Sequence, residues 1–441
     1  MPIAPLRRDP RDRRILALGL PALATVLVEP LSTIVDTAIV GHLGTAPLAG
    51  LALASSVLNA SFWVFNFLSF GTTSRVAFLT GRQDHRSAAA SGAQGLWLCA
   101  CIGIPVGMVL AALADPIASA MGGHGQVASA AATYLRISAV GTPFVLVALV
   151  GNGYLRGVAD TRTPLRVVVA ANVLNVVLEV ALVYGVHLGV AGSAWGTVVA
   201  QAVAAAWFAV LVARRVRAAG CGLRPVAQEM GRLVVVGRHL FVRTGALLAT
   251  LTLATSVAAR LGPTILAAHQ IALQVWLFVT IAFDGLAIPA QTITGTLLGQ
   301  GDIDECRRYA RRMCILGAWF GGAVAVLLVA ASRWLPGLFT SDARVARQAA
   351  AALVIVGVLQ LPDAVLFVLD GVLMGASDFG FLRASTVGGL LAFLPVGASI
   401  LAWHRLGIVG LWSGLGVWLF VRLAVNAVRF AGRQWTLVAH T

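Results

Sequence analysis

The stretch LVEPLSTIVDTAIVGHLG, residues 27–44, combines the apolar character of a membrane span with charge. It holds two carboxylates, Glu29 and Asp36, and a proline, Pro30. An ionised side chain in the hydrocarbon core of a bilayer is costly, so such residues face a bundle interior or water and mark functional sites. The stretch therefore predicts a membrane helix with one polar, functional face.

The composition of the whole chain supports this membrane setting. Its 441 residues are 59% hydrophobic and 11% charged, with a mean hydropathy of +0.89. Spanning segments of about 20 residues must satisfy their own backbone groups, so we expect helices and an all-α integral membrane protein. Twelve transmembrane helices are expected, at about 15–38, 47–79, 92–114, 128–155, 163–184, 190–213, 236–259, 265–298, 311–331, 347–374, 384–403 and 407–428.

The net charge of +15 is mainly a topology signal. Arginines concentrate in alternate loops between the apolar runs, which is the pattern of cytoplasmic loops. Both chain termini are then expected in the cytoplasm, and no nucleic-acid partner is expected. The main exception is a group of three arginines before the tenth run, at Arg333, Arg344 and Arg347.

The chain also shows none of the motifs that would indicate an enzyme or a metal protein. Its five cysteines are scattered without zinc spacing, and we expect them to be reduced and structural. Phosphate-loop, HExxH and GxSxG motifs are missing from the sequence. We therefore expect no enzymatic activity, no metal site and no cofactor.

An internal duplication organises the sequence, because one half matches the other at a constant offset. The matched segments are HLGTAPLAGLALASSV (42–57) with RLGPTILAAHQIALQV (260–275), LTGRQD (79–84) with LLGQGD (297–302), NGYLRGVAD (152–160) with DGVLMGASD (370–378), and LGVAGSAWG (188–196) with LGIVGLWSG (406–414). Two positions related by this offset, such as 42 and 260, are called repeat equivalents below. We expect an N-lobe at 1–213, a cytoplasmic linker loop at 214–235 and a C-lobe at 236–441.

Six helices per repeat predict parallel repeats related by an axis along the membrane normal, an arrangement that places a central cavity between two bundles. Duplication alone also fits a passive membrane scaffold, so the polar residues inside the spans decide between the two interpretations.

The N-terminal half carries an acidic cluster. Asp36 follows Glu29 with i, i+7 spacing, which places both near one helix face, and Pro30 is expected to act as a hinge. Asn172, Asn175 and Glu179 form a second polar stripe with i, i+3, i+7 spacing. The repeat equivalents of Asp36 and of this stripe are not polar: they are Ala254, Leu390, Phe393 and Gly397. The cluster therefore predicts a function confined to the N-lobe rather than general helix adhesion.

The C-terminal half has polar candidates of its own. Asp284 and Asp370 stand where the first repeat has Asn66 and Asn152. We expect Asn152, Asp284 and Asp370 to line the substrate cavity together with Glu29. Gln270 and Gln274 add hydrogen-bonding groups to the same predicted lining.

Three segments resemble the multidrug and toxic compound extrusion (MATE) transporters, specifically the DinF-like branch. They are EPLSTIVDTAIVGHLG (29–44), residues 261–302 and FVLDGVLMGASD (367–378). The resemblance covers essentially the whole chain. It implies two six-helix lobes around a central cavity, and export of organic, often cationic or amphipathic, compounds in exchange for H⁺ or Na⁺.

The resemblance also implies roles for individual residues. Asp36 matches the acid linked to proton coupling in this branch. Asn175 and Glu179 match an LNxxLD pattern, with Glu179 in place of the usual aspartate. Thr197 and Tyr134 stand at positions that are polar in relatives, so we add Thr197 to the coupling candidates and Tyr134 to the cavity candidates.

The resulting expectation is a secondary active multidrug exporter of a bacterial cell membrane, monomeric, with H⁺ as the coupling ion. Protonation of the N-lobe acids would remove charge from a low-dielectric site and release a bound cation outward. Na⁺ is the alternative ion, because carboxylate and amide oxygens also coordinate it. A flippase for a lipid-linked precursor and a non-transporting scaffold or receptor are the alternatives from other classes.

Overall fold

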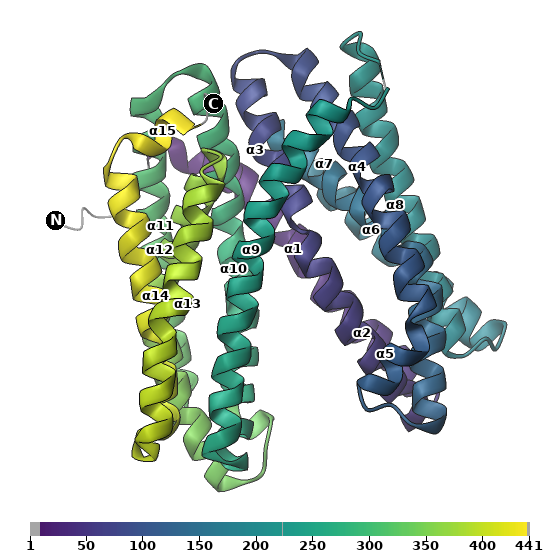
Figure 1. Cartoon of the computed structure of the whole chain (residues 1–441), viewed down its shortest axis with the longest axis vertical. Helices are drawn as coiled ribbons and strands as arrows, with labels where there is room; N and C mark the ends of the chain where they lie inside the picture. Colours follow the sequence, from purple (N-terminus) through teal and green to yellow (C-terminus); the bar gives the residue numbers. More distant parts are fainter. Residues whose placement is uncertain (1–8, 223, 439–441) are drawn as a thin grey trace. The chain divides into compact units, whose positions relative to one another are not determined.

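The computed structural model describes residues 9–222 and 224–438. The predicted lobe ranges also include residues 1–8, 223 and 439–441, which lie outside the described residues. All regular elements of the described part are helical (Figure 1): α1 (Pro10–Gly41), α2 (Thr45–Phe65), α3 (Phe67–Gly81), α4 (His85–Ala112), α5 (Ala114–Ala120), α6 (Gly125–Gly157), α7 (Arg162–Val180), the π-helix η1 (Ala181–Gly185), α8 (Val190–Ala218), α9 (Ala227–Leu261), α10 (Pro263–Gln300), α11 (Ile303–Ala331), the 3₁₀ helix η2 (Leu335–Leu338), α12 (Ala343–Gly375), α13 (Phe379–Ala402), the 3₁₀ helix η3 (His404–Leu406), α14 (Gly407–Ala431) and α15 (Gln434–Val438).

The predicted number of spans is confirmed. Within residues 9–222 and 224–438, twelve helical segments are long and apolar enough to cross a membrane. The second combines α2 and α3, and the fifth combines α7 and η1. Helices α8 and α9 extend into the expected linker, and the described stretches between them are only 219–222 and 224–226.

The duplication extends to the bounds of the helices. Helices α6 and α12 begin and end at repeat-equivalent positions, and both have 33 residues. The same shift places α4 on α11, and α8 on α14, with small differences at their ends. The prediction of two six-helix repeats in the same order is thus confirmed at the level of single helices.

Unusual backbone conformations repeat at the same offset. Gly44 and Gly262, which precede α2 and α10, have φ of 126° and 119°. Gly189 and Gly407, at the starts of α8 and α14, have φ of 57° and 50°. Such angles favour glycine because it lacks a Cβ. The duplication has therefore preserved the turns as well as the helices.

Two equivalent aspartates cap equivalent helices. Asp84 accepts a hydrogen bond from the backbone N–H of Ser87 at 2.9 Å, and Asp302 accepts one from Glu305 at 3.0 Å. Each satisfies a backbone donor that the first turn of a helix leaves free. The same bond from Ser87 stabilises the charged form of Asp84 and holds its pKa below the usual value.

Two compact units make up the chain, and their boundaries fall inside helices. Unit 1 comprises residues 1–20 and 238–441, and unit 2 comprises 21–237. One boundary therefore lies within α1, before Pro21, and the other within α9. The two boundaries are nearly repeat equivalents, so each unit holds the beginning of a helix that the other unit continues. The predicted lobe ranges stay a prediction, and contacts group these helix beginnings differently.

The beginning of α1 is fixed within unit 1 by charge. Arg312 of α11 donates to both carboxylate oxygens of Asp12, at 2.8 and 2.7 Å. Arg11 pairs with Glu305 at 2.9 Å. In unit 2, Met230 and Leu233 of the first turns of α9 pack against a buried cluster that includes Leu98. Both helix beginnings are thus integral parts of the units that hold them.

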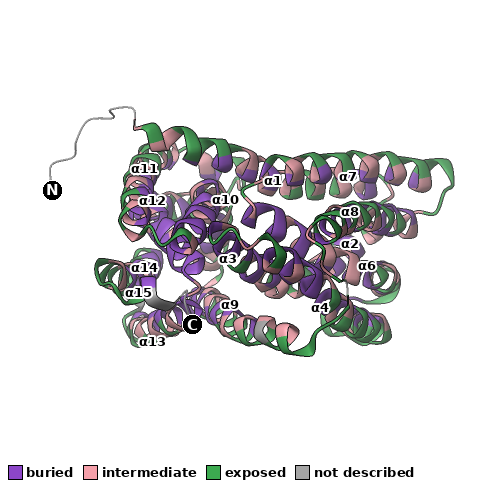
Figure 2. Ribbon diagram, turned by 90° about the horizontal axis from the view of Figure 1, so that it is seen from above, coloured by how far each residue is buried: buried purple, intermediate pink, exposed green. Residues whose placement is uncertain are grey.

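One central helix organises each unit, and the two are repeat equivalents. In unit 2, α6 contacts α2, α3, α4 and α8. In unit 1, α12 contacts α10, α11 and α14. The most apolar stretches of α6 and α12 are 50% and 67% buried, each the highest value among the spans of its unit. Figure 2 shows buried residues on the inner faces of the helices and exposed residues on their outer faces.

Small residues allow α12 to approach α10 closely. A Cβ atom on Gly371 would lie 2.4 Å from the backbone oxygen of Ala287, and one on Gly375 would lie 2.3 Å from that of Gln291. Neither distance is tolerated between such atoms, and backbone cannot step aside as a flexible side chain can. Small residues serve this purpose in membrane bundles because packing, rather than water exclusion, holds the helices together.

We expect Gly371→Ala to destabilise unit 1 by about 1–3 kcal/mol, because the added methyl group forces α10 and α12 apart. Gly388→Ala is the matched control, since a Cβ there would meet nothing within 4 Å. Thermal unfolding of the purified protein in detergent measures the stability of both variants. Equal unfolding midpoints for the two variants would contradict the close α10–α12 packing.

Candidate functional site

The predicted acidic cluster comes together within unit 2. Asn175 of α7 donates through Nδ2 to Oδ1 of Asp36 of α1 at 3.1 Å. One turn further along α7, Glu179 accepts a hydrogen bond from the hydroxyl of Ser193 of α8. The carboxyl groups of Asp36 and Glu179 are themselves close enough to interact. Two acids from helices far apart in sequence thus share one polar site.

Hydroxyl groups surround the two acids. Tyr134 of α6 is 5% exposed, and its hydroxyl lies near those of Thr197 and Ser193. The site therefore draws on α1, α6, α7 and α8. Of the predicted coupling residues, Asp36, Asn175, Glu179 and Thr197 meet here, and Tyr134, predicted as a cavity residue, joins them.

Two buried oxygen atoms of this site lack hydrogen-bond donors. Oε2 of Glu179 and Oδ1 of Asn175 have no partner among the described residues. Glu179 is 0% exposed and Asn175 is 4% exposed. A buried acceptor without a donor costs free energy, so the arrangement favours an added proton or cation. In the described part of the chain, no three His, Cys, Asp or Glu side chains are grouped as metal ligands would be.

Glycines of α8 create the close contact that brings Ser193 to Glu179. A Cβ atom on Gly196 would lie 3.1 Å from the backbone nitrogen of Glu179, and one on Gly192 would lie 2.9 Å from the carbonyl carbon of Leu182. With glycine at both positions, α8 lies against the end of α7, and the side chain between them reaches the acid.

A π-helix follows the acid directly. Helix α7 ends at Val180 and η1 occupies Ala181–Gly185. The hydroxyl of Tyr184 in η1 donates to the backbone oxygen of Ile39 at 2.7 Å. Single-turn π-helices are rare and occur frequently at functional sites. Through the Tyr184 hydrogen bond, the π-helix η1 connects the segment after Glu179 with the segment of α1 after Asp36.

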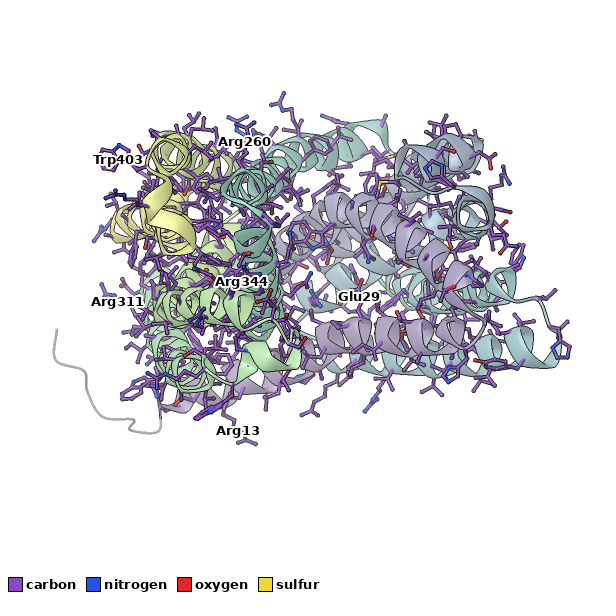
Figure 3. All side chains as sticks on the ribbon, turned by 90° about the horizontal axis from the view of Figure 1, so that it is seen from below. Arg13, Glu29, Arg260, Arg311, Arg344 and Trp403 are labelled. Carbon is purple, nitrogen blue, oxygen red and sulfur yellow. The ribbon has the colours of Figure 1, made fainter. Side chains whose placement is uncertain are left out.

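The remaining N-terminal candidates lie outside this network. Asn172 donates to the backbone oxygen of Val168 on its own helix at 2.8 Å. Glu29, labelled in Figure 3, is exposed on α1, and its carboxylate makes no hydrogen bond or ion pair with a described residue. Helix α1 continues through Pro30, so its role as a hinge stays a prediction. Asn152 of α6 has a buried side-chain oxygen without a partner in the described part of the chain.

Unit 1 contains a different polar network, centred on Asp370 of α12. Arg243 of α9 and Arg422 of α14 both donate to its Oδ2, at 2.6 and 2.8 Å. Asn426 donates to Oδ1 at 2.7 Å and accepts from Ser385 of α13 at 2.7 Å. Asp370 and both arginines are at most 8% exposed. The network therefore joins four helices of unit 1 around one carboxylate.

The other C-terminal candidates do not join this network through any bond described above. Asp284 is half-buried on α10, and Gln270 is half-buried on the same helix. Gln274, one turn further along, is exposed. Asp363, a second buried acid of α12, accepts a hydrogen bond from the indole N–H of Trp276 at 2.9 Å. The cavity role of Asp284, Gln270 and Gln274 stays a prediction.

The duplication serves as an internal control for both networks. The repeat equivalents of Asp36, Tyr134, Asn175, Ser193 and Thr197 all lie within the hydrophobic core of unit 1: they are Ala254, Ala352, Phe393, Leu411 and Leu415. The repeat equivalents of Ser385, Arg422 and Asn426 all lie within a hydrophobic cluster of unit 2: they are Val167, Ala204 and Phe208. Asp370 and Arg243 themselves correspond to polar residues of unit 2, Asn152 and Thr25. Most of the residues that surround each acid therefore have apolar equivalents in the other unit.

Sequence reasoning did not single out Ser193, Arg243 or Arg422. A signal existed for the arginines, because each interrupts an apolar run, and an ionisable residue in a span needs a partner. Ser193 lies in the matched segment 188–196, but its importance depends on the three-dimensional approach of α8 to Glu179.

Helical topology and membrane character define a class: multi-pass membrane proteins with a duplicated helical scaffold. The family model MatE matches residues 21–181 and 246–398. The chain belongs to the MatE family, which is a family of transporters.

Individual relatives agree with this assignment. Protein DETOXIFICATION 44, chloroplastic, of Arabidopsis thaliana is 34% identical, over 95% of this chain and 82% of its own length. DNA damage-inducible protein F of Escherichia coli is 28% identical, over 96% and 93%. A probable multidrug resistance protein NorM of Thermotoga maritima is 24% identical, over 96% and 93%.

Solved structures share the fold. A MATE crystal structure in a bent conformation has a TM-score of 0.88 at 20% identity, and covers 98% of both chains. An outward-facing multidrug resistance MATE transporter has a TM-score of 0.85 at 21% identity and covers 97% of both chains.

We expect Asp370→Asn to lower the stability of unit 1 by about 3–5 kcal/mol, because two buried guanidinium groups lose their shared charge partner. Asn152→Ala, at the equivalent position of unit 2, is the control and removes no charge. Thermal unfolding in detergent reports the difference. A midpoint for Asp370→Asn as high as that of the control would show that the network does not hold unit 1 together.

Tyr184→Phe should loosen the end of α1 without unfolding the protein. Loss of a hydrogen bond worth about 1 kcal/mol corresponds to roughly five-fold faster hydrogen exchange of local amides around Ile39. Mass spectrometry of exchanged peptides measures this rate. Tyr154→Phe is the control, because the Tyr154 hydroxyl makes no hydrogen bond with a described residue. An unchanged rate of amide hydrogen exchange near Ile39 would show that the hydrogen bond from Tyr184 does not hold the end of α1.

Proposed function

We propose that this protein is a secondary active multidrug exporter that moves organic cations or amphipathic compounds in exchange for protons. Relatives named as probable multidrug resistance proteins support the export of drugs. The observation that carries proton coupling is the contact between Asp36 and Glu179, with a buried acceptor on Glu179 that lacks a donor.

A proton is the simplest group that relieves this site. Two carboxylates side by side repel each other, and a proton between them removes one charge and supplies the missing donor. In the proposed cycle, protonation from the outside neutralises the site and the bound cation leaves outward. Deprotonation toward the cytoplasm then restores the negative charge that attracts the next cation.

The chain's own residues support the cycle in distinct ways. Asn175 fixes the position of Asp36, and Ser193 fixes that of Glu179. Tyr184 joins the helix turn after Glu179 to α1, so a change of charge at the acids can alter the path of α1. Helix breaks at Pro30 or Pro21 would absorb such a change, because proline removes a backbone hydrogen bond.

The proposal includes alternating access to a central cavity, with Glu29, Asn152, Asp284, Asp370, Gln270 and Gln274 as cavity residues. It includes cytoplasmic termini, a bacterial cell membrane and a monomer. Na⁺ is the rival coupling ion, since the unpartnered oxygens of Glu179 and Asn175 are ligands that this ion accepts.

Export of ethidium from proteoliposomes, driven by a pH gradient or by a Na⁺ gradient, tests the proposal. We expect export driven by the pH gradient, and a loss of about ten-fold or more in Asp36→Asn and in Glu179→Gln, within the usual range of coupling free energies. Asp115→Asn is the control, because Asp115 is an exposed acid of the same unit paired with Arg136.

Other outcomes would change the proposal in defined ways. Proton-driven export that survives intact in Asp36→Asn would remove this acid from the coupling site. Export driven only by Na⁺ would reassign the oxygens to metal coordination. If neither gradient drives export, a labelled lipid-linked precursor becomes the next substrate, as expected for a flippase.

A further inference from the structure

One end of unit 1 carries a concentration of positive charge that the transport proposal does not use. Three connections lie at this end: α9 to α10, α11 to α12, and α13 to α14. They and the adjoining turns carry five exposed arginines and one acid, Asp342. The arginines are Arg260, Arg333, Arg344, Arg347 and Arg405. Figure 3 labels Arg260 and Arg344 here, and Trp403 from the third connection.

The position of these arginines differs from the distribution of positive charge expected for the chain. Most loop arginines lie at the other end of the helices, where the positive-inside pattern places them. The repeat equivalents in unit 2 are His42, Asp115, Gln126, Ser129 and His187. None is an arginine, so the shared scaffold does not require the five arginines of unit 1.

A pocket of about 440 Å³ opens between the first turns of α10 and α12. Its lining comprises Thr264, Arg344, Arg347, Gln348 and Ala351. The side chains of Thr264, Arg347 and Gln348 form no hydrogen bonds with described residues. The pocket therefore presents several unused donors and no acid of its own.

The acid of the connection that leads into α12, Asp342, already accepts hydrogen bonds from that helix. Oδ1 of Asp342 accepts hydrogen bonds from the backbone nitrogens of Arg344 and Val345, at 2.7 and 3.4 Å, and caps α12. The guanidinium Nε of Arg344 lies 3.8 Å from the same oxygen, a distance too long for a hydrogen bond. Arg347 adds a second positive charge one turn further along. The pocket thus has a net positive field that suits a phosphate group.

Exposed apolar side chains adjoin the pocket in sequence. Trp334 and Leu338, in the connection that leads into α12, are 75% and 80% exposed, and Phe339 is 55% exposed. Trp403 from the neighbouring connection is 71% exposed. Aromatic residues beside arginine at the end of a membrane helix are typical of the level of lipid headgroups. A ligand that satisfies both features carries an anionic head and apolar chains.

We propose that this pocket binds the headgroup of an anionic phospholipid from the adjacent leaflet. Arg344 and Arg347 hold the phosphate, Thr264 and Gln348 donate to its oxygens or to the glycerol, and the apolar connection contacts the acyl chains. A zwitterionic lipid fits less well, because its own cation would face the two guanidinium groups. The proposal does not depend on the coupling mechanism.

Native mass spectrometry of the full-length chain in detergent, titrated with phosphatidylglycerol or phosphatidylcholine, tests it. We expect phosphatidylglycerol to bind more tightly. The double variant Arg344→Gln/Arg347→Gln should weaken its binding about 30-fold, at the usual strength of two arginines near an anionic lipid surface. The matched control is Arg13→Gln/Arg311→Gln, which removes the same charge from the first turns of α1 and α11, away from the connections that form the pocket.

Three results would overturn the proposal. The first is equal affinity of the unaltered protein for the two lipids, which needs no variant to fold. The second is equal loss of binding in the test and control variants, which would show a general charge effect. The third is full displacement of the lipid by glycerol phosphate at equal concentration, which would identify a site for free phosphate. Retained phosphatidylglycerol binding in Arg344→Lys/Arg347→Lys would support recognition by charge.

Discussion

The structure depends on the need to satisfy every polar group away from water. Helical backbone meets this need along all twelve spans, and glycine contacts then allow the helices to approach closely. Ionisable side chains meet it in two other ways. Asp370 accepts hydrogen bonds from two arginines and an asparagine, so its charge is fully compensated. The carboxylate of Glu179 is not fully compensated, because one of its oxygens has no hydrogen-bond donor among the described residues. A complete network suits stability, whereas an incomplete one suits a site that takes up and releases an ion.

Duplication makes this contrast informative. Both units inherited one scaffold, with matching helix bounds, the same capping aspartates and the same glycine turns. Their polar networks nevertheless differ, because most residues around each acid have apolar equivalents in the other unit, although Asp370 itself corresponds to Asn152. Polar groups that merely held such a scaffold together would be expected in both. The divergence therefore indicates that the units specialised after duplication, one around an incomplete pair of acids and the other around a compensated ion network.

Much of the fold could be predicted from the sequence, because the signals involved are periodic or repeated. Apolar runs indicated the twelve spans, and a constant offset indicated the repeats. Helical spacing placed Asn175 and Glu179 on one face, and Asp36 could be grouped with them because none of the three has a polar repeat equivalent. Ser193 and Tyr184 could not be placed, since their contacts depend on how closely α8 approaches α7 and on the register change of the π-helix. The partners of Asp370 were not predicted, because sequence spacing does not relate arginines on α9 and α14 to an acid on α12.

The unit boundaries inside α1 and α9 have a consequence for how the chain can be divided. The two sequence repeats and the two compact units of this protein have different boundaries. A gene fragment ending in the connection between α8 and α9 would encode the beginning of α1, which forms ion pairs with Arg312 and Glu305 of unit 1. The same fragment would lack the first turns of α9, which pack against the core of unit 2. Each half-length polypeptide would thus be missing one helix segment and carry another that needs a partner. Neither half-length polypeptide would therefore correspond to a complete folded unit.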